Sequence, residues 1–337
     1  YDWSSGISSG QAFFPKTWRE CLLRTRKINT GFLLCWKDQK VNLGSTDLQI
    51  CYNAFEKAFV LGTKAFSTLR KKENRFMKEK IKQLKCFILD MDGTIYLGNE
   101  LFDFTPAFLK KVEETGREYY FFTNNSSKSQ QAYIDKLAGM EIFIRPEQMM
   151  ISSHVMIEYL KENHPGESLY VVGTPSLIRE FERFDMPLTA EDPDIVILGF
   201  DTTLTYEKMS KACHYVRNGC VYYGINPDWN CPIEGGDFIP DCGSMAKMIE
   251  ASTERFPEFF GKPSKHTLDY IIKQTGYKPE EIAIVGDRLY TDIAVADKSP
   301  VTSILVLSGE STREDVEQSA VKPDIILDSL ADITAVL

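Results

Sequence analysis

The chain has 337 residues, of which 43% are hydrophobic and 26% are charged, and its formal net charge is −9. This length and composition are those of an ordinary globular protein with a sizeable core, and the length favours two domains over one. The acidic balance argues against nucleic acid or an anionic membrane as a general partner, and no apolar run approaches the ~20 residues of a membrane span. Eight cysteines without a C-x-x-C pair favour reduced thiols, so we expect a cytoplasmic protein.

The first 76 residues differ in charge from the rest of the chain. They carry 13 Lys or Arg against 6 Asp or Glu, a net charge of +7, whereas the remaining residues have a net charge of −16. They contain no methionine, and the first one in the chain is Met77. We expect the native protein to start at Met77 and residues 1–76 to be translated upstream sequence or a fusion remnant. The alternative is a basic arm that binds nucleic acid or a partner in a salt-sensitive way.

From residue 86 onward, apolar strand patterns alternate with helical patterns. In chain order they are strand 86–90, helix 105–115, strand 117–125, helix 129–137, strand 168–174, helix 175–184, strand 193–200, helix 205–218, strand 220–228, helix 243–253, helix 265–276, strand 281–287 and strand 302–309. Near-continuous apolar strands separated by helices indicate a parallel sheet that is covered on both faces. The sequence therefore predicts an α/β fold.

Polar residues collect where three of these predicted strands end. Asp90 and Asp92 follow the first strand, residues 123–125 (Thr-Asn-Asn) end the second, and Asp287 ends the strand at 281–287. A lone D-x-D pattern is weak, because Asp also starts turns and caps helices. Three strand ends from distant parts of the chain are a stronger signal, because open α/β sheets bind ligands at the carboxyl ends of their strands.

Four short motifs resemble those of the haloacid dehalogenase superfamily, in the expected order. They are DMDGTI (90–95), FFTNNS (121–126), GKPS (261–264) and GDRLYTD (286–292). Their residue patterns are most similar to those of the NagD-like, p-nitrophenyl phosphatase branch, subfamily IIA. The resemblance covers about Met77 to the C-terminus and leaves residues 1–76 unmatched.

The resemblance implies a Rossmann-like, doubly wound parallel-sheet core with an inserted α/β cap domain. About 140 residues separate the second and third motifs, far more than one crossover helix needs. We expect the core at 77–164 and 257–337 and the cap at 165–256, with hinges near 164–166 and 255–260. Within the cap, the loop 226–244 is expected to face substrate. There Asn226, Asp228 and Glu234 would bind sugar or base hydroxyls, although a purely structural loop is an equally weighted alternative.

The family chemistry assigns roles to the two acids of the first motif. By resemblance Asp90 is the nucleophile that forms an aspartyl-phosphate, and Asp92 protonates the leaving group and then activates water. Two residues along an extended strand return the side chain to the same face, so both carboxylates can reach one phosphoryl group. Lys262 would pair with Asp90 and the transferring phosphoryl group.

The remaining motif residues are expected to bind phosphate and a metal. The Thr123 hydroxyl and the Asn124 backbone N–H would donate to phosphoryl oxygens, and Asn125 is evenly weighted between a supporting and a structural role. The predicted phosphate turn is formed by Gly93 and Thr94. The predicted metal is Mg²⁺, bound by Asp90, the backbone carbonyl of Asp92 and Asp287, while Asp292 either orients a water on the metal or binds the metal directly.

Together these features predict a Mg²⁺-dependent phosphatase of small phosphorylated metabolites, of the sugar phosphate, nucleotide or phosphoglycolate type. A phosphotransferase or mutase of the same superfamily is the nearest alternative. A non-catalytic binding module is disfavoured, because every motif position holds a competent residue. We expect neither nucleic acid nor membrane as a partner, and a homodimer through the cap is left open.

Overall fold

The structure is a computed structural model that describes residues 35–36, 39–40, 75, 77–233 and 237–337. The chain divides into two units, 1–73 and 74–337. In the first unit the described residues form the antiparallel pair β1 (Cys35–Trp36) and β2 (Gln39–Lys40). The rest of the basic segment lies outside the described residues, so the start at Met77 stays a prediction.

The second unit contains a six-stranded parallel sheet. In spatial order its strands are β16 (Ile325–Leu327), β15 (Thr302–Val306), β14 (Ile282–Gly286), β3 (Cys86–Leu89), β6 (Glu118–Thr123) and β7 (Met149–Ile151). All four residues of β3 are buried, as expected for a central parallel strand with both faces covered. The first motif follows β3 directly and the fourth follows β14, so the two motifs meet at the same edge of the sheet.

Helices cover both faces of this sheet. Phe87 and Leu89 of β3 face a cluster that includes α3 (Thr105–Glu114), α4 (Gln130–Gly139) and α11 (Leu330–Thr334). Ile88, which points to the opposite face, packs in a cluster with α5 (Ser152–Asn163) and α9 (Lys265–Thr275). The two clusters take alternate residues of the same strand, which is the doubly wound arrangement.

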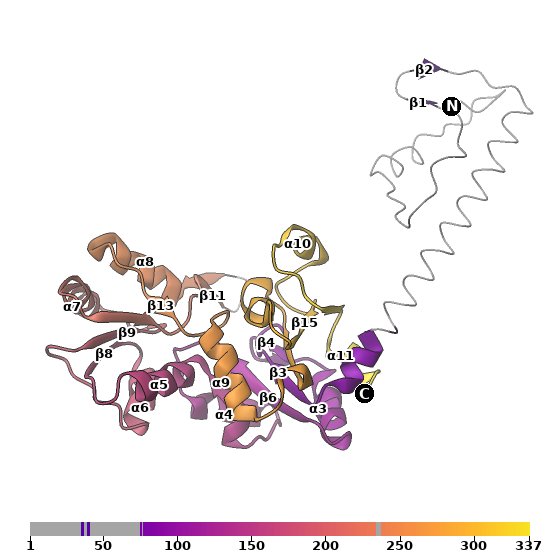
Figure 1. The fold of residues 1–337 in the computed structure, drawn as a ribbon, viewed down its shortest axis with the longest axis horizontal. Helices are drawn as coiled ribbons and strands as arrows, with labels where there is room; N and C mark the ends of the chain where they lie inside the picture. The colour runs from indigo at the N-terminus through magenta and orange to yellow at the C-terminus, as the bar shows by residue number, and fades with distance from the viewer. Residues whose placement is uncertain (1–34, 37–38, 41–74, 76, 234–236) are drawn as a thin grey trace, which may run out of the picture. The chain divides into compact units, whose positions relative to one another are not determined.

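A second parallel sheet is inserted between α5 and α9. Its spatial order is β13 (Glu258–Phe259), β10 (Val221–Gly224), β9 (Ile195–Leu198) and β8 (Leu169–Val172). Figure 1 shows α7 (Tyr206–Arg217) and α8 (Cys242–Thr253) on one side of it, with α5 and α6 (Pro175–Arg183) on the other. The predicted fold class, a Rossmann-like core with an inserted α/β cap, is confirmed. The exact cap boundaries stay a prediction.

Short elements complete the described part of the second unit. They are the hairpins β4 (Tyr96–Leu97) with β5 (Glu100–Leu101) and β11 (Asn230–Pro232) with β12 (Phe238–Pro240), the helix α10 (Arg313–Gln318), and the turns η1 (Pro146–Gln148), η2 (Pro279–Glu281), η3 (Leu289–Ile293) and η4 (Ala294–Ala296). The described residues include no helix that is both long and apolar enough to cross a membrane.

Polar contacts fasten the cap to the core beside α6. The Thr174 hydroxyl, which caps α6, donates to the Ser127 carbonyl at 2.7 Å, and the Ser129 N–H donates to the Ser176 hydroxyl at 3.0 Å. On the next turns of α6, Glu180 lies 2.7 Å from Nε2 of His154 on α5, and both side chains are buried. This side of the cap is therefore held to the core by several short contacts.

Candidate active site

The chain makes a tight turn directly after β3, and this turn places Asp90 beside the end of β14. The Asp90 N–H donates to the Val285 carbonyl at 2.8 Å, which continues the pairing of the two strands. Gly93 has a φ of +85°, and a β-carbon on it would lie 2.3 Å from Oδ2 of Asp287. Because only glycine avoids both the positive-φ strain and this contact, Gly93 allows the first and fourth motifs to approach each other closely.

Lys262 lies between two carboxylates of this site. Its Nζ donates to Oδ1 of Asp90 and to Oδ1 of Asp292, each at 2.6 Å. The lysine side chain is 3% exposed and that of Asp292 is 1% exposed, so these are charge-assisted contacts shielded from water. The third and fourth motifs are thus joined to the nucleophile candidate through one ammonium group.

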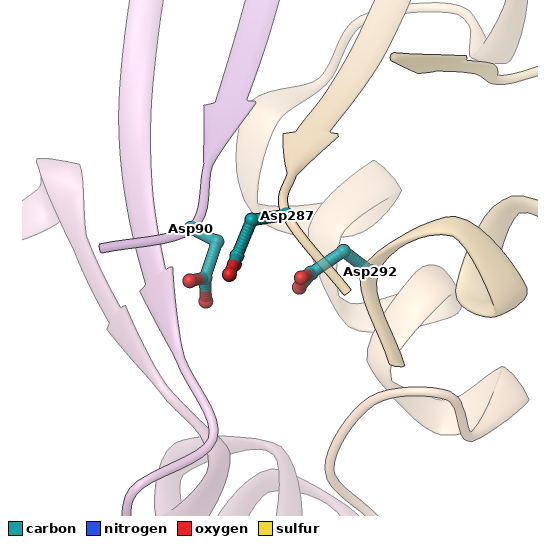
Figure 2. A group of neighbouring side chains, drawn as sticks. All are labelled: Asp90, Asp287 and Asp292. Atoms are coloured by element: carbon teal, nitrogen blue, oxygen red, sulfur yellow. The ribbon is translucent and has the colours of Figure 1, made fainter. Parts of the chain in front are cut away.

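Asp90, Asp287 and Asp292 form an acidic cluster, with one carboxylate oxygen from each within 4.8 Å of the others. Figure 2 shows the three side chains beside one another, with the Asp287 carboxylate between those of Asp90 and Asp292. Burial and the nearby Asp292 raise the pKa of Asp90 to about 7, although the Lys262 ammonium opposes this rise. Burial, followed by the charges of Asp90 and Asp292, also raises the pKa of Asp287 well above its ordinary value. The cluster therefore carries more negative charge than its surroundings balance.

The oxygens of Asp287 are unequally satisfied. Oδ2 accepts the Glu310 N–H at 2.7 Å, whereas the buried Oδ1 has no hydrogen-bond partner in the described part of the chain. An unpartnered buried carboxylate oxygen is costly, and it is the kind of ligand that a hard divalent cation takes. The acidic cluster consequently fits a metal such as Mg²⁺.

The other predicted residues of the first two motifs surround this cluster. Asp92 is half-buried, and its Oδ1 accepts the Gly98 N–H at 3.3 Å. Thr94 is fully buried, and its hydroxyl has no partner among the described residues. The Thr123 hydroxyl accepts the Asn125 N–H at 3.2 Å, and Asn125 itself is half-buried. These positions stay compatible with the expected phosphate turn, whose contacts remain predictions.

Asn124 has a side-chain role that the sequence did not indicate. Its Oδ1 accepts the Lys262 N–H at 2.8 Å, and its Nδ2 donates to the Lys262 carbonyl at 2.9 Å. A β-carbon on Gly261 would lie 2.7 Å from Asn124 Oδ1, so the glycine leaves room for the amide. The backbone N–H of Asn124 is predicted to bind phosphate. Its side chain, in addition, hydrogen-bonds to both backbone groups of Lys262, the candidate catalytic lysine.

The predicted cap residues are more enclosed than expected. Asn226 is fully buried; it accepts from the Ser126 hydroxyl at 2.7 Å and donates to Asp228 at 2.9 Å and to Asp241 at 3.0 Å. It has no exposed surface for a substrate hydroxyl in this conformation. Asp228 is 6% exposed and accepts from both Asn124 and Asn226. Glu234 lies outside the described residues, so its expected contact with substrate stays a prediction.

Sequence reasoning missed two charged residues of this site, Arg288 and Asp241. Arg288 lies within the fourth motif, and its guanidinium nitrogens lie 2.9 Å from Oε2 of Glu310 and 3.6 Å from Oδ1 of Asp228. Asp241 accepts the Cys242 N–H at the start of α8, and burial together with the charge of Asp228 raises its pKa to about 7. The only sequence signal for Asp241 was its position before a predicted helix.

Two family models match stretches of the second unit. A model described as haloacid dehalogenase-like hydrolase matches residues 87–187, and one described as HAD-hydrolase-like matches residues 259–333. An acid sugar phosphatase of Staphylococcus aureus (strain MRSA252) is 33% identical over 258 residues, which cover 76% of this chain and 99% of the relative.

Solved structures give the same pattern. The 4-nitrophenylphosphatase of Thermotoga maritima is 39% identical and superposes with a TM-score of 0.73 over 76% of this chain and 98% of its own. NagD from E. coli K-12 is 30% identical, with a TM-score of 0.68 over 74% of this chain and 98% of its own.

Proposed function

Because the chain belongs to the haloacid dehalogenase-like hydrolases, in their NagD-like, p-nitrophenyl phosphatase branch, we propose that it is a Mg²⁺-dependent phosphatase of small phosphate monoesters. The observation that carries the proposal is the pairing of Lys262 with Asp90 beside the acidic cluster. It brings a nucleophile, a cation and oxygen ligands to one point at the sheet edge. The names of the relatives, acid sugar phosphatase and 4-nitrophenylphosphatase, support this reaction class and favour sugar phosphates among the substrates expected from sequence.

In the first step an Asp90 carboxylate oxygen attacks phosphorus, and the bond from phosphorus to the ester oxygen breaks. Asp92 donates a proton to the departing alkoxide. In the second step Asp92 takes a proton from water, whose oxygen attacks phosphorus; the bond to Asp90 breaks and phosphate leaves. The ammonium of Lys262 favours the ionised form of Asp90 that this chemistry requires.

The metal would be held by Asp90, Asp287 and the backbone carbonyl of Asp92. Bound Mg²⁺ supplies positive charge that offsets repulsion between the carboxylates and a phosphate dianion. The unpartnered Oδ1 of Asp287 supports its role as a direct ligand. Both oxygens of Asp292 already accept hydrogen bonds, from Lys262 Nζ at 2.6 Å and from the Arg288 N–H at 3.1 Å, which favours an indirect role for this acid.

Phosphate release from p-nitrophenyl phosphate tests the proposal. The protein is expected to turn over this ester only when Mg²⁺ is present, and Asp90→Asn is expected to remove the activity. Asp103→Asn, the same change at an exposed acid, serves as the matched control and should retain it. Turnover that persists in Asp90→Asn would show that another residue is the nucleophile.

A further inference from the structure

A closed ring of contacts joins the cap to the residues that hold the catalytic lysine. We propose that Asp228 of the cap is a positioning residue for Lys262, acting on its backbone through Asn124 and on the Asp292 loop through Arg288. The five residues Asp228, Asn124, Lys262, Asp292 and Arg288 are called the positioning ring below. The inference rests on the proposed function and adds a role for the cap in it.

The first arm of the ring runs through the amide of Asn124. Its two N–H groups donate to Oδ2 of Asp228 at 2.9 Å and to the Lys262 carbonyl at 2.9 Å, and its oxygen accepts the Lys262 N–H at 2.8 Å. A carboxylate can only accept hydrogen bonds, so Asp228 holds the amide in the same orientation that the Lys262 backbone requires. In this orientation the Asn124 amide hydrogen-bonds to both the N–H and the carbonyl of Lys262.

The second arm runs through Arg288. Its guanidinium faces Oδ1 of Asp228 at 3.6 Å, and its backbone N–H donates to Oδ2 of Asp292 at 3.1 Å. The other oxygen of Asp292 accepts from Lys262 Nζ at 2.6 Å, which closes the ring. Lys262 is thus held at both ends, by the Asn124 amide at its backbone and by Asp90 and Asp292 at its ammonium group.

Asp228 is itself anchored within the cap. Its Oδ2 also accepts a hydrogen bond from the Asn226 amide at 2.9 Å. The same amide donates a second hydrogen bond to Asp241 at the start of α8. The Asp228 carbonyl accepts the Gly243 N–H of the same helix at 2.8 Å. Helix α8 of the cap is therefore connected to Lys262 by a series of hydrogen bonds between buried groups, so the position of one constrains the position of the other.

This arrangement makes Asp228 an unsuitable group for binding a leaving group. The residue is 6% exposed, and both carboxylate oxygens face the ring. Its loss should displace Lys262 relative to Asp90 and slow the chemical step equally for every ester. A residue that instead bound substrate hydroxyls would matter only for esters that carry them.

The test compares Asp228→Ala, which removes both acceptor oxygens, with wild type on two esters. One is p-nitrophenyl phosphate, whose leaving group has no hydroxyl to bind, and the other is glucose 6-phosphate. We expect kcat to fall roughly 10- to 100-fold on both esters, because displacement of a catalytic group by about 1 Å costs this much, with KM within roughly threefold of wild type. Glu191→Ala, the same truncation at an exposed acid of the same cap, is the matched control and should leave both constants unchanged.

A second variant separates positioning from folding. Asn124→Ser removes the amide that connects Asp228 to Lys262, and it should show the same loss of kcat on both esters. The double variant should lose less than the product of the two single losses, because both changes open the Asn124 arm. Thermal unfolding midpoints confirm that the compared proteins are folded, and if Asp228→Ala does not fold, Asn124→Ser alone decides.

A loss confined to glucose 6-phosphate, or additive losses in the double variant, would overturn the positioning role. Unchanged kcat in both single variants would overturn it as well, while leaving the proposed phosphatase intact. Wild type that releases no phosphate from either ester would defeat the proposed function and, with it, this role for Asp228.

Discussion

A β-carbon on Gly93 would lie 2.3 Å from Oδ2 of Asp287, well inside van der Waals contact. The two residues belong to the first and fourth motifs, which are almost two hundred positions apart in the chain. Their close approach brings the turn after β3 against the acid at the end of β14. The short distance between Asp287 and the turn that carries Asp90, the proposed nucleophile, therefore depends on the absence of a side chain at Gly93.

Gly93→Ala is expected to inactivate the enzyme and to destabilise it. The methyl group must displace Asp287, and a non-glycine residue at a φ of +85° adds roughly 1–2 kcal/mol of backbone strain. Gly116→Ala is the control, since Gly116 has a φ of +70° with no atom within 4 Å of a β-carbon. Urea unfolding should show a loss in both variants, and phosphatase assays should show a loss in Gly93→Ala only. Equal activity in the two variants would contradict the close approach.

Asp287→Asn should change stability in opposite directions with and without metal. The folded-state pKa of Asp287 is raised, so its ionised form opposes folding at neutral pH when no metal is bound. The amide lacks that charge, and the metal-free variant should unfold at a higher temperature than wild type. Mg²⁺ at about 100 times its Kd should stabilise wild type by ~2.7 kcal/mol and the variant by much less. An equal response to Mg²⁺ would show that Asp287 is not a ligand.

Lys262→Met should destabilise the protein by roughly 3–5 kcal/mol near neutral pH, because it leaves buried carboxylates without their cation. The folded-state pKa of Asp90 is about 7, so this acid is largely protonated at lower pH and the penalty should shrink there. Lys265→Met is the control: that lysine is 81% exposed and pairs with Asp269 on the surface, so its loss should cost about 1 kcal/mol or less. Denaturant unfolding at two pH values measures both effects, and equal losses at Lys262 and Lys265 would contradict a buried ion pair.

Asp241→Asn should flatten the dependence of stability on pH. The carboxyl of Asp241 has a folded-state pKa of about 7 against an ordinary value of 3.8. Between these values the unfolded chain releases a proton that the folded protein keeps, so stability contributed by this group falls as pH rises, by roughly 1 kcal/mol for each pH unit. Asparagine can still accept the Cys242 N–H at the start of α8. Unfolding free energies of both proteins are measured from about pH 4 to pH 8. As pH rises, the variant should become increasingly stable relative to wild type, and a difference that does not change with pH would contradict the shifted pKa.

Local pattern was sufficient to predict most of the alternating elements and the strand ends that carry the site. β3, β6 and β14 are apolar runs that stop at Asp90, at the Thr-Asn-Asn segment and at Asp287, as their hydrophobic pattern indicates. β7 was missed because its three residues are followed without a break by α5, and a short apolar run next to a helix has no distinguishing period. Strand order also required information beyond local pattern, since β3 pairs with β14 across most of the second unit.

The cap side of the site was predictable only in part. Asn226 and Asp228 were selected as polar residues of a Pro- and Gly-rich loop, and that pattern cannot distinguish an exposed side chain from a buried one. The contact of Asp228 with Asn124 depends on two loops from different sheets approaching each other. Arg288 was present in a quoted motif, but its partner in the cap lies sixty positions earlier, where no local signal connects them.

The strand order has a consequence for how the protein is made. β3 lies in the middle of its sheet, with β6 on one edge and β14 on the other. During synthesis β6 follows soon after β3, whereas β14 emerges only after the whole cap has been translated. Until then the apolar strand Cys86–Leu89 has one unpaired edge, which is the kind of surface on which nascent chains aggregate. Late pairing of β14 therefore completes the sheet and the acidic cluster in one event, and an unfinished chain has neither.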